Sequence, residues 1–424
     1  GKVYGCGRPA TAGEDETPDP DFLKDSYNEA VTSDRTSTYV SISGNGVKVG
    51  HVYGGGNGKY SYYNDNSYSF LHLTSPEQPS TLVDITTTGG LINQAFGGGN
   101  MAVVDDAAVY YHASGFVDTL FAGGNSATVT HKAFAKLDNT GDPVGKPNLS
   151  SAPSAAKTDS DDQVHVKYFF GGNNQATMTI LPDIILSQGK VYKVYGGGNA
   201  GAMEGKTPKQ DVFGRTVPNV STYLKIESNN VEVTNAIFGG CNNANVKYTA
   251  YVEVLGGHIA SLFGGNDVSA DVKTTRIDML DGLVQSLFGG GNGYYDYSVT
   301  SNNRFNVTEK GTSNSVVVGC VGRPFVEETH VNIWGGEVNA NIFGGGYAGN
   351  CRNTHVEIND KASYNGRTLG KTYTDGESQE QMMPGGNAVI TGKIFGGGYG
   401  DESLLGTANE HVGCVTGYRT DRHD

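Results

Sequence analysis

Short runs of alternating hydrophobic and polar residues recur along the chain. Residues 251–263 read Tyr-Val-Glu-Val-Leu-Gly-Gly-His-Ile-Ala-Ser-Leu-Phe, and residues 276–288 read Arg-Ile-Asp-Met-Leu-Asp-Gly-Leu-Val-Gln-Ser-Leu-Phe. Val252 and Val254 flank Glu253, a period of two that is typical of a β-strand with one buried face. The Gly-Gly or Asp-Gly pair in the middle of each run predicts a turn. Each run therefore predicts two short strands joined by a turn.

The second strand of each run ends on an aromatic residue that is followed by glycines and an asparagine, as in residues 287–292. With the aromatic as a phase marker, the signal returns at Tyr4, Tyr53, Phe96, Phe121, Phe170, Tyr195, Phe238, Phe263, Phe288, Phe343 and Phe395, with Val318 as a degenerate member. The markers stand 25 residues apart in 96 to 121, 170 to 195, 238 to 263 and 263 to 288. A 25-residue unit with insertions in some copies accounts for the other intervals.

A third, weaker alternation such as Ala102-Val103-Val104 follows the glycines. Three short strands and three turns in 25 residues predict one coil of a parallel β-helix. We therefore expect an all-β fold, a β-solenoid of about a dozen coils that forms a single domain over residues 1–424 and belongs to a longer repetitive chain. The Leu-x-x-Leu-x-Leu frame of leucine-rich repeats is absent from the sequence, and turns come too often for helical repeats.

The glycine-asparagine corner has a structural explanation. Glycines permit positive φ and a close approach of the next coil, and asparagine side chains can hydrogen-bond to one another along the stack. We expect an interrupted ladder of Asn57, Asn100, Asn125, Asn199 and Asn292. A phosphate cradle would not recur about ten times in one chain.

Each aromatic marker follows an aliphatic residue, and strict alternation sends only one of the two inward. If the aromatics point inward they stack as the core; if the preceding aliphatics point inward, the aromatics form an outward strip that could meet insertions or sugar rings. Of the two directions, we favour the aromatics as core. The column then contains Phe96, Phe121, Phe238, Phe263, Phe288, Phe343 and Phe395.

Insertions interrupt the repeat, and we expect all of them to follow the glycine corner and so to share one edge. They span residues 9–35, 58–79, 132–162, 200–218 and 361–386. Loops on a rigid scaffold often carry binding functions. Asn64-Asp65-Asn66, residues 159–162 and the acidic run near Glu14 offer oxygen ligands suited to calcium, although EF-hand spacing is absent from the sequence. No other cofactor is expected.

Composition narrows the classes of partner. Glycine makes up 63 of 424 residues, about 15% and twice ordinary usage. A net charge of −14 without clustered Lys and Arg argues against nucleic acid. No run of 18 apolar residues predicts a membrane span. The five cysteines lack the spacing of a zinc site, so we expect small buried residues.

One strand face carries candidate chemistry. The repeat places Tyr251, Arg276, His330 and His355 in one outward column and Asp278 and Glu357 in the next. Histidine, arginine and carboxylates together suit acid-base work on a glycosidic bond. The alternative is the ordinary polar face of a solvated sheet.

The repeat resembles the right-handed parallel β-helix proteins of bacterial surfaces and the secreted polysaccharide-active enzymes of that architecture. The resemblance covers nearly the whole chain, but no individual family is matched and no catalytic residue is transferred. It implies an extracellular protein whose partner is a glycan or another surface, and whose ends contact further repeats or other subunits. Three functions stay open: a structural or adhesive module, a carbohydrate-active enzyme, and a phage tail-spike-like protein.

Overall fold

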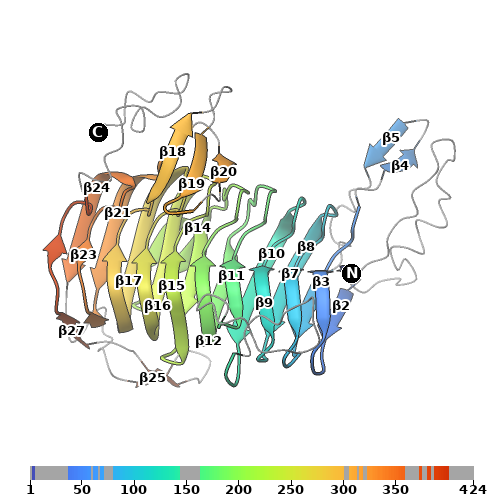
Figure 1. Ribbon diagram of the computed structural model, residues 1–424, viewed down its shortest axis with the longest axis horizontal. Helices are drawn as coiled ribbons and strands as arrows, with labels where there is room; N and C mark the ends of the chain where they lie inside the picture. Colours follow the sequence, from blue (N-terminus) through green and yellow to red (C-terminus); the bar gives the residue numbers. More distant parts are fainter. Residues whose placement is uncertain are drawn as a thin grey trace.

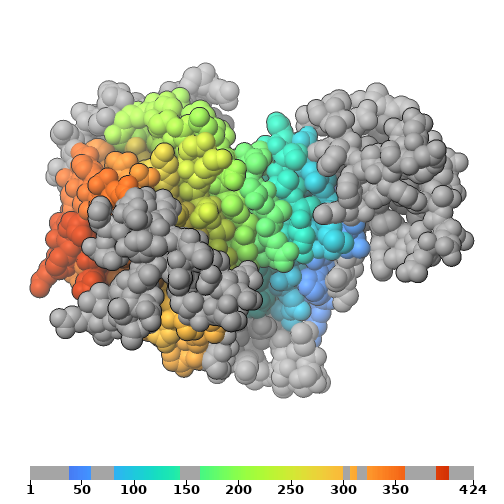
Figure 2. All heavy atoms as spheres, turned by 90° about the horizontal axis from the view of Figure 1, so that it is seen from above, coloured from blue at the N-terminus to red at the C-terminus, as the bar shows by residue number. Residues whose placement is uncertain are grey.

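The computed structural model describes residues 2–4, 37–58, 61–64, 67–70, 80–143, 163–299, 305–312, 315–318, 322–358, 372–374, 380–382 and 386–400. These residues form an all-β protein in which parallel strands dominate, and no helix occurs among them. The strands lie side by side in chain order along the long axis, from β2 and β3 at one end to β27 at the other (Figure 1). The same order is visible from above, where the colours change from blue to red along that axis (Figure 2).

One parallel ladder, which we call the first ladder, joins strands that each begin a repeat. Its members are β2 (Ser37–Ile42), β6 (Ser80–Ile85), β8 (Val104–Tyr111), β10 (Val129–Asp138), the first half of β12 (Pro182–Tyr195), β14 (Thr216–Ile226), the first halves of β16 (Val246–Phe263) and β17 (Asp271–Phe288), β21 (Phe325–Ile333) and β24 (Asn350–Ile358).

A second parallel ladder joins the strands that end on the aromatic markers or lead to them. Its members are β1 (Lys2–Tyr4), β3 (Lys48–Tyr53), β7 (Leu91–Phe96), β9 (Phe116–Phe121), β11 (Val166–Phe170), the second halves of β12, β16 and β17, β15 (Val231–Phe238), β22 (Gly335–Val338), β23 (Ile342–Phe343), β27 (Gly386–Ile390) and β28 (Ile394–Phe395).

The remaining strands are antiparallel additions. They are β13 (Thr207–Gln210), which pairs with β14, the sheet of β18 (Tyr295–Val299), β19 (Phe305–Glu309) and β20 (Ser315–Val318), and the pairs β4 (Ser61–Asn64) with β5 (Ser67–Phe70) and β25 (Thr372–Thr374) with β26 (Glu380–Met382).

The main core lies between the two ladders and consists mostly of aliphatic side chains. Val252, Val254, Ile277 and Met279 come from the first ladder, as their alternation predicts, and Leu287 comes from the second. All five are at most 1% exposed, so nearly their whole apolar surface is removed from water.

The expected direction of the aromatic markers is wrong. The residue before each marker from Tyr53 to Phe343, such as Leu262 before Phe263 or Leu287 before Phe288, belongs to the main core. The markers from Tyr53 to Phe343 form a second buried cluster on the opposite face of the same strands, because adjacent side chains of a strand point to opposite sides. Phe395, at the end of the row, is 41% exposed. Their rings stack from Tyr53 to Phe395 with centroids 4.5–5.1 Å apart and planes within 4–17°. We call this stack the aromatic column.

The corner glycines are required for close approach and not for positive φ. None of the described corner glycines has a positive φ, whereas Gly257 and Gly282 in the turns between the two ladders have φ of 93° and 95°. A Cβ on Gly265 would lie 2.9 Å from the nitrogen of Gly291, and one on Gly289 would meet the carbonyl oxygen of Gly344. The expectation of left-handed backbone at the corner is therefore wrong.

A threonine hydroxyl supports the corner in several repeats. The amides of Gly264 and Gly265 donate to the carbonyls of Phe288 and Gly290, so the bend leaves the carbonyl of Gly289 out of the ladder. The Thr275 hydroxyl donates to that carbonyl at 2.6 Å. Equivalent bonds, at 2.5–2.7 Å, come from Thr38, Thr81, Thr222 and Thr329.

Val318 is not part of the repeat, contrary to the prediction. Phe288 pairs directly with Phe343, while Val318 lies in β20 opposite Phe305, so Val318 is not a member of the column. Its region is an insertion with enough alternation of its own to form a small antiparallel sheet.

The insertions do not share one edge. Lys132 to Asp138 continue β10 in the first ladder, so that insertion begins after the first ladder strand, whereas the segment from Ala200 follows a glycine corner. Figure 1 accordingly shows β18 to β20 and β25 at opposite edges. Residues 9–35 lie outside the described part of the chain.

No helix in the part of the chain that the structure describes is long and apolar enough to cross a membrane.

Candidate functional site

The columns expected on the outer face of the first ladder are formed. Tyr251 pairs with Arg276, Arg276 with His330, and His330 with His355. Glu253, Asp278, Asn332 and Glu357 are in register in the neighbouring column. The 25-residue spacing therefore predicts the pairs Tyr251–Arg276 and His330–His355 correctly. Arg276 and His330 pair directly although they are 54 residues apart, because the region of Val318 is an inserted sheet and not a repeat between them.

The insertion from Ala200 to Pro218 covers the middle of this face. Val217 and Val220 pack against Tyr251, and Phe213 packs edge-on against Trp334 with ring centroids 5.0 Å apart. Tyr251 and Asp278 are both 0% exposed as a result. Sequence reasoning does not anticipate this cover because the insertion has no strong hydrophobic pattern.

Asp278 is the centre of a satisfied buried network. Its Oδ2 accepts hydrogen bonds from the Tyr251 hydroxyl at 2.9 Å and the Arg276 Nε at 2.8 Å, and its Oδ1 accepts one from Asn332 at 2.7 Å. Arg276 also bonds Asp211 of the covering insertion at 2.9 Å. Three of the predicted binding residues, Tyr251, Arg276 and Asp278, thus hold the insertion to the ladder and offer little surface to a ligand.

His330, His355 and Glu357 stay partly or fully exposed at the end of the face. The two imidazole rings lie 5.7 Å apart at 50°, and His330 Nε2 lies 3.2 Å from the Glu328 carboxylate. This is a solvated surface of mixed charge.

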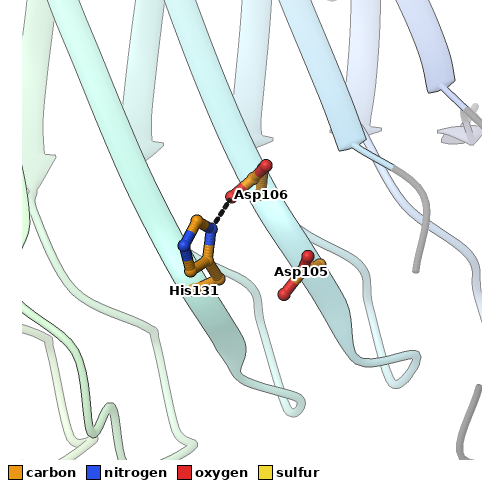
Figure 3. Close-up of side chains that lie close together, drawn as sticks. All are labelled: Asp105, Asp106 and His131. Atoms are coloured by element: carbon orange, nitrogen blue, oxygen red, sulfur yellow. Dashed lines mark hydrogen bonds and ion pairs between the residues drawn. The ribbon is translucent and has the colours of Figure 1, made fainter. Parts of the chain in front are cut away.

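Asp105, Asp106 and His131 form a second polar group that the sequence reading misses. They meet because β8 pairs with β10, and their ligand atoms lie within 4.8 Å of one another. His131 points toward Asp106, with Nδ1 2.6 Å from Oδ1, while its side chain is 66% exposed (Figure 3). Residues 65–66, residues 159–162 and Glu14, on which the calcium expectation rests, lie outside the described residues.

The asparagine positions of the corner form a longer ladder than expected. Each side-chain amide donates to the next oxygen at 2.7–2.8 Å, in the order Asn100 to Asn57, Asn125 to Asn100, Asn174 to Asn125, Asn199 to Asn174 and Asn242 to Asn199. Asn174 and Asn242 come from altered copies of the motif and fill the expected interruptions. We call this row the asparagine ladder.

Asp267 replaces asparagine at the next rung and gathers several donors. Its Oδ1 accepts hydrogen bonds from Asn292 and from the Tyr295 hydroxyl, both at 2.7 Å. Its Oδ2 accepts hydrogen bonds from the Tyr195 hydroxyl at 2.8 Å and from Lys193 at 3.0 Å. Because Tyr295 belongs to β18, Asp267 also attaches the small antiparallel sheet to the ladder.

A groove runs along the aromatic column beside the asparagine ladder. It contains two cavities of about 330 and 320 Å³, and Lys193 lines both. The first is lined by Tyr168, Tyr192, Asn174 and Asn199 and is bounded by Val307 and Glu309 of β19. The second is lined by Asn235, Ser261, Ser286, Tyr294 and Tyr347. Hydroxyls, amides and phenol rings thus share the lining with phenylalanine rings of the aromatic column.

Lys193 crosses the groove between the two cavities. Its side chain starts on the second ladder, its Nζ lies 5.6 Å from the centre of the Phe238 ring, and it ends on Asp267. Burial opposes the charge of Lys193, but the Asp267 carboxylate outweighs that cost and raises the pKa of Lys193 above its ordinary value. Burial and Asp267 also raise the pKa values of Tyr195 and Tyr295, so both phenols stay protonated donors.

No family model matches the chain, and neither a curated protein nor a solved structure matches it.

Proposed function

We propose that the chain is a parallel β-solenoid that acts as a structural or adhesive module outside the cell and binds a glycan in the groove. Two parallel ladders that advance one repeat at a time around a shared aliphatic core support the solenoid. The resemblance to surface β-helix proteins supports the extracellular location, which labelling of intact source cells with an antibody against the purified chain would test.

The asparagine ladder is the observation that carries glycan binding. A side-chain amide has two N–H donors and two acceptor lone pairs. Asn199 uses one donor toward Asn174 and one lone pair toward Asn242, which leaves one donor and one acceptor at each such rung. A row of half-buried amides beside phenol rings suits a ligand that presents many hydroxyls and apolar ring faces.

A groove-filling variant tests this proposal. Ser286 lines the second cavity, whereas its neighbour Gln285 is exposed and lines neither cavity. We expect Ser286→Tyr to abolish binding on a glycan array and Gln285→Tyr to leave it intact. Equal binding by both variants would place the ligand elsewhere, and an array without any bound glycan would refute glycan binding.

The enzyme alternative finds less support. Asp278 is enclosed by donors, and Tyr223 and Tyr251 donate to the buried Glu253. Burial raises the pKa of Glu253, but the residue is only 3% exposed, which leaves a glycosidic bond little access to its carboxylate.

A further inference from the structure

We infer that the groove selects an extended, uncharged polysaccharide whose chain runs along the asparagine ladder. This inference rests on the proposed function, and it names the class of glycan and its orientation. Three observations support the inference: the charges that line the groove, the direction of the asparagine ladder and the position of Lys193.

The charges of the groove disfavour an acidic glycan. Lys193 is the one cation among the described residues that line the two cavities, and Asp267 already neutralises it. Glu309 adds a negative charge at the rim, and the chain as a whole carries −14. A uronate or sulfate would approach the Glu309 carboxylate and lose its hydration without a free cation in return.

The direction of the ladder favours an extended chain. Successive rungs lie about 4.8 Å apart, the spacing of neighbouring strands and close to the length of one pyranose unit. A polysaccharide parallel to the long axis could therefore meet an equivalent amide at each sugar. A polysaccharide that lay across the groove would contact one asparagine of the ladder and then reach β19, which bounds the first cavity.

Lys193 divides the groove and supplies its strongest donors. Its ammonium has three N–H groups, of which Asp267 takes one. The others can donate to sugar hydroxyls from either cavity. Tyr294, which is 39% exposed and stands edge-on to Tyr347 at 5.2 Å, offers a phenol face in the second cavity. Neutral hydroxyls and C–H faces are the groups that this lining can pair.

Calorimetric titration with oligosaccharides of two to eight sugars tests the inference. With neutral oligosaccharides, we expect affinity to rise with length until both cavities are spanned. Raising salt from 50 to 500 mM should change that affinity less than twofold, because exposed charges are not being paired. Lys193→Met should weaken binding about ten- to a hundredfold through loss of a charged donor. Since that variant could perturb the fold, its circular dichroism is compared with wild type, and Ser261→Tyr blocks the second cavity independently.

The outcomes separate this inference from the proposed function. Binding of acidic oligosaccharides alone, with a steep loss at high salt, would overturn the inference and leave glycan binding standing. Affinity that is already complete for a disaccharide would overturn the extended orientation. Failure of every glycan to bind would overturn both proposals.

Discussion

Replacement of Asp278 by asparagine would show whether the buried network on the first ladder is structural. The carboxylate accepts hydrogen bonds from Tyr251, Arg276 and Asn332 and has no hydrogen to donate. An asparagine would turn an N–H₂ group toward either Asn332 or the guanidinium, so donors would face donors. Of its two carboxylate partners, the guanidinium would keep Asp211.

The magnitude follows from burial. Asp278 is 0% exposed, and removal of one partner of a buried charge pair costs about 3–5 kcal/mol. In a protein built from repeats, such a loss lowers the free energy of local opening in the neighbouring strands before it unfolds the whole chain. At 1.4 kcal/mol per tenfold change, the amides of β16, β17 and β21 should exchange hydrogen about 10² to 4 × 10³ times faster than in the wild type.

Hydrogen exchange followed by mass spectrometry measures this loss, and Asp281→Asn is the matched control. Asp281 lies on the same strand, is half-buried and accepts one hydrogen bond from the amide of Gly282, which an asparagine oxygen can also accept. Its effect should stay within about 0.5 kcal/mol. Equal exchange in the two variants would refute a structural role for the network and restore Asp278 as a candidate for binding.

Three further predictions concern single groups. Burial lowers the pKa of His165 from 6.5 to about 4, so as the pH falls the unfolded chain binds this proton first. The free energy of unfolding should therefore fall by about 3 kcal/mol between pH 6.5 and 4. Denaturant titrations should show that His165→Gln removes this share of the loss, and an unchanged pH profile of the variant would contradict the prediction. Burial raises the pKa of Cys241 to about 12, so site-resolved labelling should find its thiol inert in the folded protein and reactive in urea. Equal labelling in the two conditions would argue against burial of Cys241. Thr275→Val should cost about 1–3 kcal/mol at the corner through the unpaired Gly289 carbonyl, whereas Thr275→Ser should not, as exchange at residues 286–291 would reveal.

The sequence predicts the repeat well because residues one repeat apart occupy equivalent positions on neighbouring strands. Residues 25 apart, such as Phe263 and Phe288 or His330 and His355, are strand partners in the structure. The alternation of Val252, Glu253 and Val254 also identifies the core side of the first ladder correctly. All-β class, parallel pairing and the identity of neighbours therefore follow from local pattern.

The direction of the aromatic markers could not be predicted in the same way. Leu287 and Phe288 are both apolar, so hydrophobicity alone assigns neither to the inside. The choice depends on volume: the aliphatics fill the space between the two ladders, and the rings stack on the outer side at the repeat spacing. The positions of insertions are equally hard to predict. That residues 200–218 cover Tyr251 follows from tertiary contacts and not from a pattern in their sequence.

The groove escapes motif reading for a related reason. Its lining residues, such as Lys193, Ser261 and Ser286, are the outward residues two positions before an aromatic marker, where any polar side chain is tolerated. Two departures from asparagine, at Asp267 and Tyr347, mark the site. The first becomes meaningful once Lys193, Tyr195 and Tyr295 are seen to converge on it. In a repeat protein of this kind, a binding site is thus better sought where one repeat breaks the rule of its column than where a short motif recurs.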